Sequence, residues 1–160
     1  MVCHNEARQH VVAHGPRLFP EYPVLVAYDY LTEAGRFDLG RGDLVFSNAE
    51  NSHFLVVQVR QNQPTASRNT KRQAGLKLRK RVAYYAESWA KWNPGSLVHA
   101  RVCIDGVLGP VCGPFFVESE DGKPHFEGFA GHACCTPAGM KNKEARGIMH
   151  TGCPRCPLEK

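Results

Sequence analysis

The stretch that decides the fold is RGDLVFSNAENSHFLVVQVR, which occupies positions 41–60. It holds two short apolar runs, LVF at 44–46 and FLVV at 54–57, separated by Ser and Asn residues that favour turns. This order predicts two strands joined as a hairpin. Asp43 opens the first strand, and Gln58 and Arg60 close the second, where alternation along the strand puts them on one face. Because a hairpin folds the second strand back along the first, we expect a carboxylate, an amide and a guanidinium to converge at one end of a small sheet.

These residues resemble the signature of the PD-(D/E)XK nuclease superfamily, also called restriction-endonuclease-like. In that family an Asp begins one strand, and an acidic residue, a spacer and a Lys lie on the next; here Asp43 matches the first strand and Gln58-Val59-Arg60 the second. The surroundings resemble a group of plant proteins with this fold, in which a basic run and a helix ending in Tyr-Ala-Glu follow, as at 71–72 and 85–87. The resemblance covers positions 21–105 and implies an α/β (α+β) fold with a mixed central sheet flanked by helices.

Two of the three signature positions depart from the family pattern. Mg²⁺ prefers hard oxygen ligands, which Asp43 supplies, whereas Gln58 offers only a neutral amide oxygen, as some branches of the superfamily also do. Arg60 replaces the family's Lys; it stays protonated and cannot act as a base, although it can stabilise phosphate charge. The resemblance therefore implies a degenerate Mg²⁺ site at Asp43 and Gln58, with weak or absent phosphodiester cleavage. A nuclease-type fold that has lost its chemistry, and an unrelated hairpin, are the alternatives.

Residues 22–34 (YPVLVAYDYLTEA) precede the hairpin and allow two interpretations. Apolar residues recur at helical spacing from Val24 to Leu31 and favour a helix, but every second residue from 24 to 30 is also apolar, which suits a strand. On the favoured helix, Asp29 and Glu33 share a face, and the resemblance implies that an acidic residue from this place adds a ligand to the site. Two solvated surface carboxylates are the simpler alternative.

A long amphipathic helix is predicted over residues 71–92, ended by Asn93-Pro94-Gly95. The loop before it and its first half carry seven cations and no acidic residue between 68 and 81. These are Arg68, Lys71, Arg72, Lys77, Arg79, Lys80 and Arg81. Such a stripe neutralises backbone phosphates, so we expect it to bind DNA or RNA, although a solvated helix face is the usual fate of charge runs. In related nucleases a Gln four residues before a Tyr faces the site; the matching pair here is Arg81 and Tyr85.

The totals fit a single domain of a globular protein. The chain has 160 residues, a formal charge of +5 and a pI near 8.9, which suits an anionic partner. No apolar run is long enough to span a membrane, and the first residues lack the hydrophobic segment of a signal peptide, so we expect an intracellular protein with no membrane partner. We expect an extension over residues 1–20 with a short helix at 5–14, the nuclease-like domain over 21–130 and an irregular tail over 131–160.

In the last third of the chain, alternating apolar residues predict a strand at Leu97–Ile104, and two short apolar runs at 115–117 and 125–129 predict a hairpin. The tail carries a CxxC pair, Cys153 and Cys156, which Cys134 and His150 could complete as a tetrahedral zinc site. Cys135 and His132 are further candidates, and a terminus with free thiols is the alternative. A zinc-stabilised tail would favour a second function, that of a non-catalytic protein-interaction module.

Overall fold

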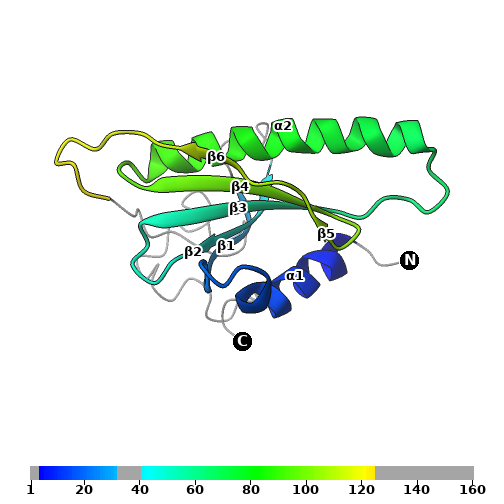
Figure 1. Ribbon diagram of the computed structural model, residues 1–160, viewed down its shortest axis with the longest axis horizontal. Helices are drawn as coiled ribbons and strands as arrows, with labels where there is room; N and C mark the ends of the chain where they lie inside the picture. Colours follow the sequence, from blue (N-terminus) through cyan, green and yellow to red (C-terminus); the bar gives the residue numbers. More distant parts are fainter. Residues whose placement is uncertain (1–3, 32–40, 125–160) are drawn as a thin grey trace, which may run out of the picture.

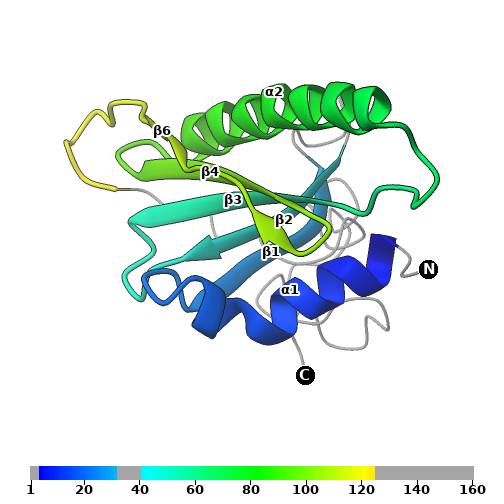
Figure 2. The same cartoon turned by 45° about the vertical axis from the view of Figure 1, so that its right-hand side comes forward.

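The computed structural model describes residues 4–31 and 41–124, which form a mixed six-stranded sheet with two helices packed against it (Figure 1). In chain order the elements are α1 (His4–Leu18), β1 (Val24–Leu31), β2 (Arg41–Ser47), β3 (His53–Arg60), α2 (Arg68–Trp92), β4 (Leu97–Ile104), β5 (Val107–Leu108) and β6 (Cys112–Phe115). The α2 helix lies along one face of the sheet and α1 along the other, as the turned view also shows (Figure 2). The predicted α/β class with a mixed sheet is confirmed.

The sheet combines an antiparallel meander with one parallel pair. Strands β1, β2 and β3 pair antiparallel in sequence order, and β3 then pairs parallel with β4 from His53↔Leu97 to Arg60↔Ile104. A parallel pair needs a crossover connection, which α2 provides. Strands β5 and β6 both pair antiparallel with β4. The carboxyl ends of β3 and β4 therefore lie at the same edge as the start of β2.

Strand β3 is buried on both faces, which explains its unbroken apolar run. Phe54 and Val56 pack against the face covered by α2, where Trp89 is 1% exposed. Leu55 and Val57 pack on the opposite face with α1. Continuous rather than alternating hydrophobicity is typical of a strand covered on both sides.

The long helix is confirmed, and it begins three residues earlier than predicted. The Ser67 hydroxyl accepts the Thr70 backbone N–H at 3.1 Å and so caps the first turn. At the other end the Asn93 side chain and backbone N–H both donate to the Trp89 carbonyl, at 2.9 and 3.0 Å. The predicted stop at Asn93 is therefore confirmed.

The favoured helix over 22–34 is wrong, because residues 24–31 form strand β1. Alternation decides the outcome: Val26 packs in the core on the α2 side and Tyr28 in the core on the α1 side. Strand β1 pairs with β2 from Val24↔Ser47 to Leu31↔Arg41. This pairing gives the backbone N–H and C=O groups of β1 hydrogen-bond partners on a neighbouring strand. Sheet pairing at long range thus overrides the helical spacing.

Helix α1 and the residues that follow it contribute to the core on one face of the sheet. Helix α1 continues past the expected stop to Leu18, and Pro16 lies inside its last turn. Val11 and Phe19 are 2% and 3% exposed and pack with Phe46 of β2. Gly15 allows this close approach, since a Cβ at this position would lie 2.8 Å from Cε1 of Phe46.

Two short strands beyond β4 were not predicted. Asp105 and Gly106, both with positive φ, form the turn between β4 and β5. Strand β6 begins three residues before the strand expected at 115–117. The second strand of that expected hairpin, at 125–129, lies outside the described residues. Neither of the two helices described is long and apolar enough to cross a membrane.

Two glycines with similar backbone angles provide a test of this packing. Gly95 (φ +85°) and Gly106 (φ +80°) are both in the left-handed region, but only at Gly95 would a Cβ meet neighbouring atoms, the closest carbon being the Lys123 carbonyl carbon at 2.8 Å. Gly106→Ala should cost about 1 kcal/mol of conformational strain. Gly95→Ala should cost roughly 1–3 kcal/mol more, because the 117–124 segment must move. Urea unfolding measures both; equal costs would contradict the close contact.

Candidate nucleic-acid interface

The structure brings Asp43, Gln58 and Arg60 together at one edge of the sheet. All three line a hollow of about 290 Å³, and Arg81 of α2 lines its opposite side. An adjoining hollow of about 400 Å³ shares Arg60 and Arg81 and is also lined by Lys77. We call these two hollows together the α2 groove. The convergence predicted from the hairpin is therefore confirmed, with the cationic helix alongside.

Asp43 and Gln58 hold β2 and β3 together where their regular pairing stops. The paired register of the two strands ends at Leu44↔Val57. One step further, the Asp43 backbone N–H donates to Gln58 Oε1 at 2.7 Å, and the Val59 N–H donates to Asp43 Oδ2 at 2.8 Å. Both side chains are nearly buried, at 5% and 4% exposure. Side-chain oxygens thus continue the sheet in place of backbone carbonyls.

Arg8 of α1 supplies a counter-charge to Asp43 that the sequence did not indicate. Its Nη1 lies 3.5 Å from Asp43 Oδ1, and the two side chains are 13% and 7% exposed. The guanidinium carbon also lies 5.2 Å from the centroid of the Tyr28 ring, in a cation–π arrangement. Local sequence gave no signal for this contact, because it depends on how α1 crosses the sheet.

This donor set does not fit the expected Mg²⁺ site. The oxygens that would bind the ion, Asp43 Oδ2 and Gln58 Oε1, already accept backbone N–H groups, and Arg8 places a positive charge beside the other carboxylate oxygen. Mg²⁺ also requires several hard, preferably anionic, oxygen ligands. Among the described residues no three His, Cys, Asp or Glu side chains gather as metal ligands.

The two additional acidic candidates do not share a helix. Asp29 lies in strand β1, at the register position opposite Asp43, because Tyr28 pairs with Leu44 and Tyr30 with Gly42. Glu33 lies outside the described residues, as do the zinc candidates Cys134, His150, Cys153 and Cys156. The expectation of a helical pair of carboxylates is corrected by the strand pairing.

Arg60 is held in a fixed orientation by a network that sequence analysis missed. Its Nε donates to Asn62 Oδ1 at 3.0 Å. Asn62 in turn donates its backbone N–H and its amide to the two carboxylate oxygens of Asp105, at 2.8 and 3.0 Å, and the Asp105 N–H returns to the Arg60 carbonyl at 2.9 Å. Only Nε is used, so both terminal nitrogens of Arg60 are without a protein partner within residues 4–31 and 41–124. They are available for a ligand that matches a fork of donors.

The seven cations at positions 68–81 form no ion pair with a carboxylate in the part of the chain that the structure describes. Lys77 and Arg81 line the α2 groove, one turn apart, and both are exposed. Lys80 is exposed as well but, like the remaining four cations, lies outside the lining of the groove. Those four are Arg68, Lys71, Arg72 and Arg79.

Tyr85 belongs to the core rather than to an exposed binding surface. It is 4% exposed and packs among the residues that join α2 to the sheet. Burial raises the pKa of its hydroxyl, Arg81 lowers it, and the Asp43 carboxylate raises it. The Tyr85 ring therefore offers no face for stacking on a base, and its hydroxyl stays protonated.

Comparisons with protein-family models, with curated proteins and with solved structures found no match to this chain. Function must therefore be inferred from the geometry of the α2 groove itself.

The contacts of Asp43 predict graded effects on stability. Asp43→Ala leaves the Val59 N–H and the nearly buried Arg8 guanidinium without this acceptor, so it should cost roughly 2–4 kcal/mol. Asp43→Asn keeps an oxygen for Val59 and should cost less. Chemical denaturation with both variants checks the order; a neutral Asp43→Ala would show that these hydrogen bonds do not stabilise the fold.

Proposed function

We propose that this protein binds the phosphate backbone of a nucleic acid in the α2 groove and cleaves it slowly or not at all. The single observation that carries the proposal is the groove itself, in which Arg60 faces Arg81 and Lys77 with no carboxylate paired to any of them within the described residues. A concentration of unneutralised cations in a concave surface is the electrostatic footprint of a phosphate-binding protein.

The mode of contact follows from the positions of the three cations. Arg60, fixed by Asn62, presents two terminal nitrogens in a defined plane, which suits two-pronged binding of a phosphate. Lys77 and Arg81 stand on the facing helix and can neutralise neighbouring phosphates along the strand. Contacts of this kind fix a nucleic acid in position without reading its bases.

The sheet edge supports kinship with the PD-(D/E)XK fold. Asp43 lies near the start of β2, and Gln58 and Arg60 near the end of the adjacent strand β3, with the cationic helix above them, which is the placement that the family resemblance implies. The finer assignment of this sheet to a restriction-endonuclease-like core is part of our proposal.

The same geometry argues against efficient hydrolysis. Cleavage in this family needs a bound metal ion and a group that can activate water. Among the described residues that line this hollow, Asp43 supplies the only carboxylate, which is paired with Arg8, and Arg60 cannot accept a proton. The described part of the site thus favours holding phosphate over hydrolysing it.

Salt dependence should reveal which cations contact phosphate. The variant Lys77→Gln/Arg81→Gln should bind a labelled 20-mer duplex or single strand more weakly, and the slope of log K against log salt should fall by about 0.7–0.9 per lost contact. Fluorescence anisotropy at several salt concentrations measures this slope.

The matched control is Arg72→Gln/Arg79→Gln, which removes the same charge from the same helix outside the lining of the groove. It should retain most of the affinity and the slope of the wild type. An equal loss in both variants would mean that net charge, rather than the groove, governs binding.

Restoring the missing charge should restore metal binding. In Arg8→Gln/Gln58→Glu, two carboxylates share the sheet edge without the adjacent guanidinium, so Mn²⁺ should bind at least tenfold more tightly than to the wild type. Mn²⁺ electron paramagnetic resonance measures the free ion, and adding Asp43→Ala should abolish the gain. Rapid Mn²⁺-dependent DNA cleavage by the wild type, lost in Asp43→Ala, would contradict the proposal of a binding-only site.

A further inference from the structure

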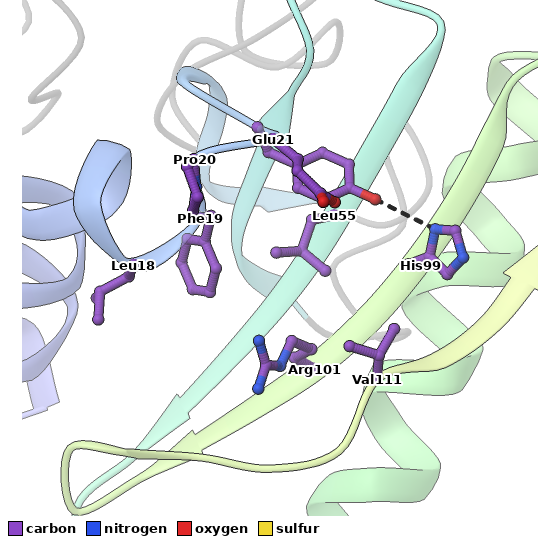
Figure 3. A pocket seen from close by; sticks show the side chains of 9 residues that line it. Leu18, Phe19, Pro20, Glu21, Leu55, His99, Arg101 and Val111 are labelled. Atoms are coloured by element: carbon purple, nitrogen blue, oxygen red, sulfur yellow. Dashed lines mark hydrogen bonds between the residues drawn. The ribbon is translucent and has the colours of Figure 1, made fainter.

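A second pocket lies on the opposite face of the sheet, on the side covered by α1. It has a volume of about 350 Å³ and sits between the end of α1 and the exposed part of strand β4 (Figure 3). Leu55 of β3 forms its floor, His99 and Arg101 come from β4, and Val111 comes from the connection between β5 and β6. Since α2 packs on the other face, this pocket is separate from the α2 groove.

Arg101 presents unused hydrogen-bond donors at this pocket. The Arg101 Nε donates to the Gly109 carbonyl at 2.9 Å, which fixes the guanidinium plane, and its terminal nitrogens have no protein partner within the described ranges. Figure 3 shows this guanidinium extending toward the side of the pocket where Leu18 and Phe19 lie. A guanidinium held in one orientation, with its terminal N–H groups unused, can donate two parallel hydrogen bonds to a carboxylate.

Tyr22 and His99 form another wall of the pocket. The two side chains are 3.3 Å apart, from the Tyr22 hydroxyl to His99 Nδ1 (Figure 3). Burial first, and then the Glu21 carboxylate, raise the pKa of Tyr22, so its hydroxyl keeps its proton. The hydrogen bond between the two side chains holds this wall of the pocket in place.

Apolar walls and one carboxylate limit what the pocket can hold. Leu18, Phe19 and Leu55 offer an apolar surface against which a flat or aliphatic group can pack. Glu21 lines the pocket opposite Arg101 in Figure 3, so the lining carries one anionic and one cationic side chain. A ligand with two negative charges would be repelled by Glu21, whereas a single negative charge can be met by Arg101 alone.

From these features we propose that this pocket binds a small organic monocarboxylate with an apolar body, its carboxylate on Arg101 and its body against Phe19 and Leu55. The pocket's volume falls in the range of small-molecule sites, roughly 300–1,000 Å³. This function is independent of nucleic-acid binding and uses none of the residues of the α2 groove.

The test is a ¹H–¹⁵N correlation titration of the full chain with phenylacetate. The amides of His99, Arg101 and Val111 should shift, while that of Arg81 should not. Three further probes share the same ring but differ in the polar group: neutral phenylacetamide, dianionic phenylphosphonate and cationic phenethylamine. Each should bind at least tenfold more weakly than phenylacetate.

Two variants separate the ligand contacts from the fold. Arg101→Gln should weaken phenylacetate binding at least tenfold. Lys77→Gln/Arg81→Gln, in the α2 groove, should bind phenylacetate as the wild type does. A spectrum with native dispersion shows that each variant is folded.

Several results would overturn the assignment. These are no shifts with phenylacetate at high millimolar concentration, equal binding of phenylacetamide, tighter binding of phenylphosphonate or phenethylamine, and unchanged affinity in a folded Arg101→Gln. The last result would mean that Arg101 only anchors the Gly109 carbonyl. Loss of nucleic-acid binding in the groove variant leaves this test unaffected, so the two proposals fail separately.

Discussion

Parallel pairing of β3 with β4 is the constraint on which the rest of the structure depends. It forces the chain to cross over the sheet as α2, and it brings the carboxyl ends of both strands to one edge. The hairpin between β2 and β3 delivers Asp43 to that same edge. The basic first half of α2 starts there because the crossover must start there. The cationic groove is therefore a consequence of topology combined with the placement of charge along a single helix.

At Asp43 the atoms that stabilise the sheet are the same ones that a metal ion would need. Its carboxylate and the Gln58 amide complete the sheet where the backbone pairing ends, and Arg8 neutralises the charge that remains. A buried carboxylate needs such partners, since an uncompensated charge would cost several kcal/mol. The bonds that keep Asp43 in place are those that leave it poorly suited to a metal ion. Arg60 differs, because its hydrogen bond to Asn62 uses only Nε. Its terminal nitrogens have no partner among the described residues.

Sequence alone could predict the elements with a strong local pattern. The hairpin strands, the long helix and the strand Leu97–Ile104 were found because their apolar spacing has a single interpretation. Residues 24–31 fitted two periods, and only pairing with β2 decided between them. Arg8, Asn62 and Asp105 were missed because their roles come from contacts between segments distant in the chain, which leave no local signal. The convergence at Asp43 was predictable because one hairpin spans it.

The close seating of α1 has a consequence for the integrity of the chain. Gly15 lets the helix approach Phe46, and Val11 and Phe19 complete that side of the core. A protease that removed α1 would expose the apolar residues of β2 and β3 that it covers. It would also remove Arg8, the cation paired with Asp43. Such a surface promotes self-association. Helix α1 thus shields apolar surface of the sheet that would otherwise promote self-association.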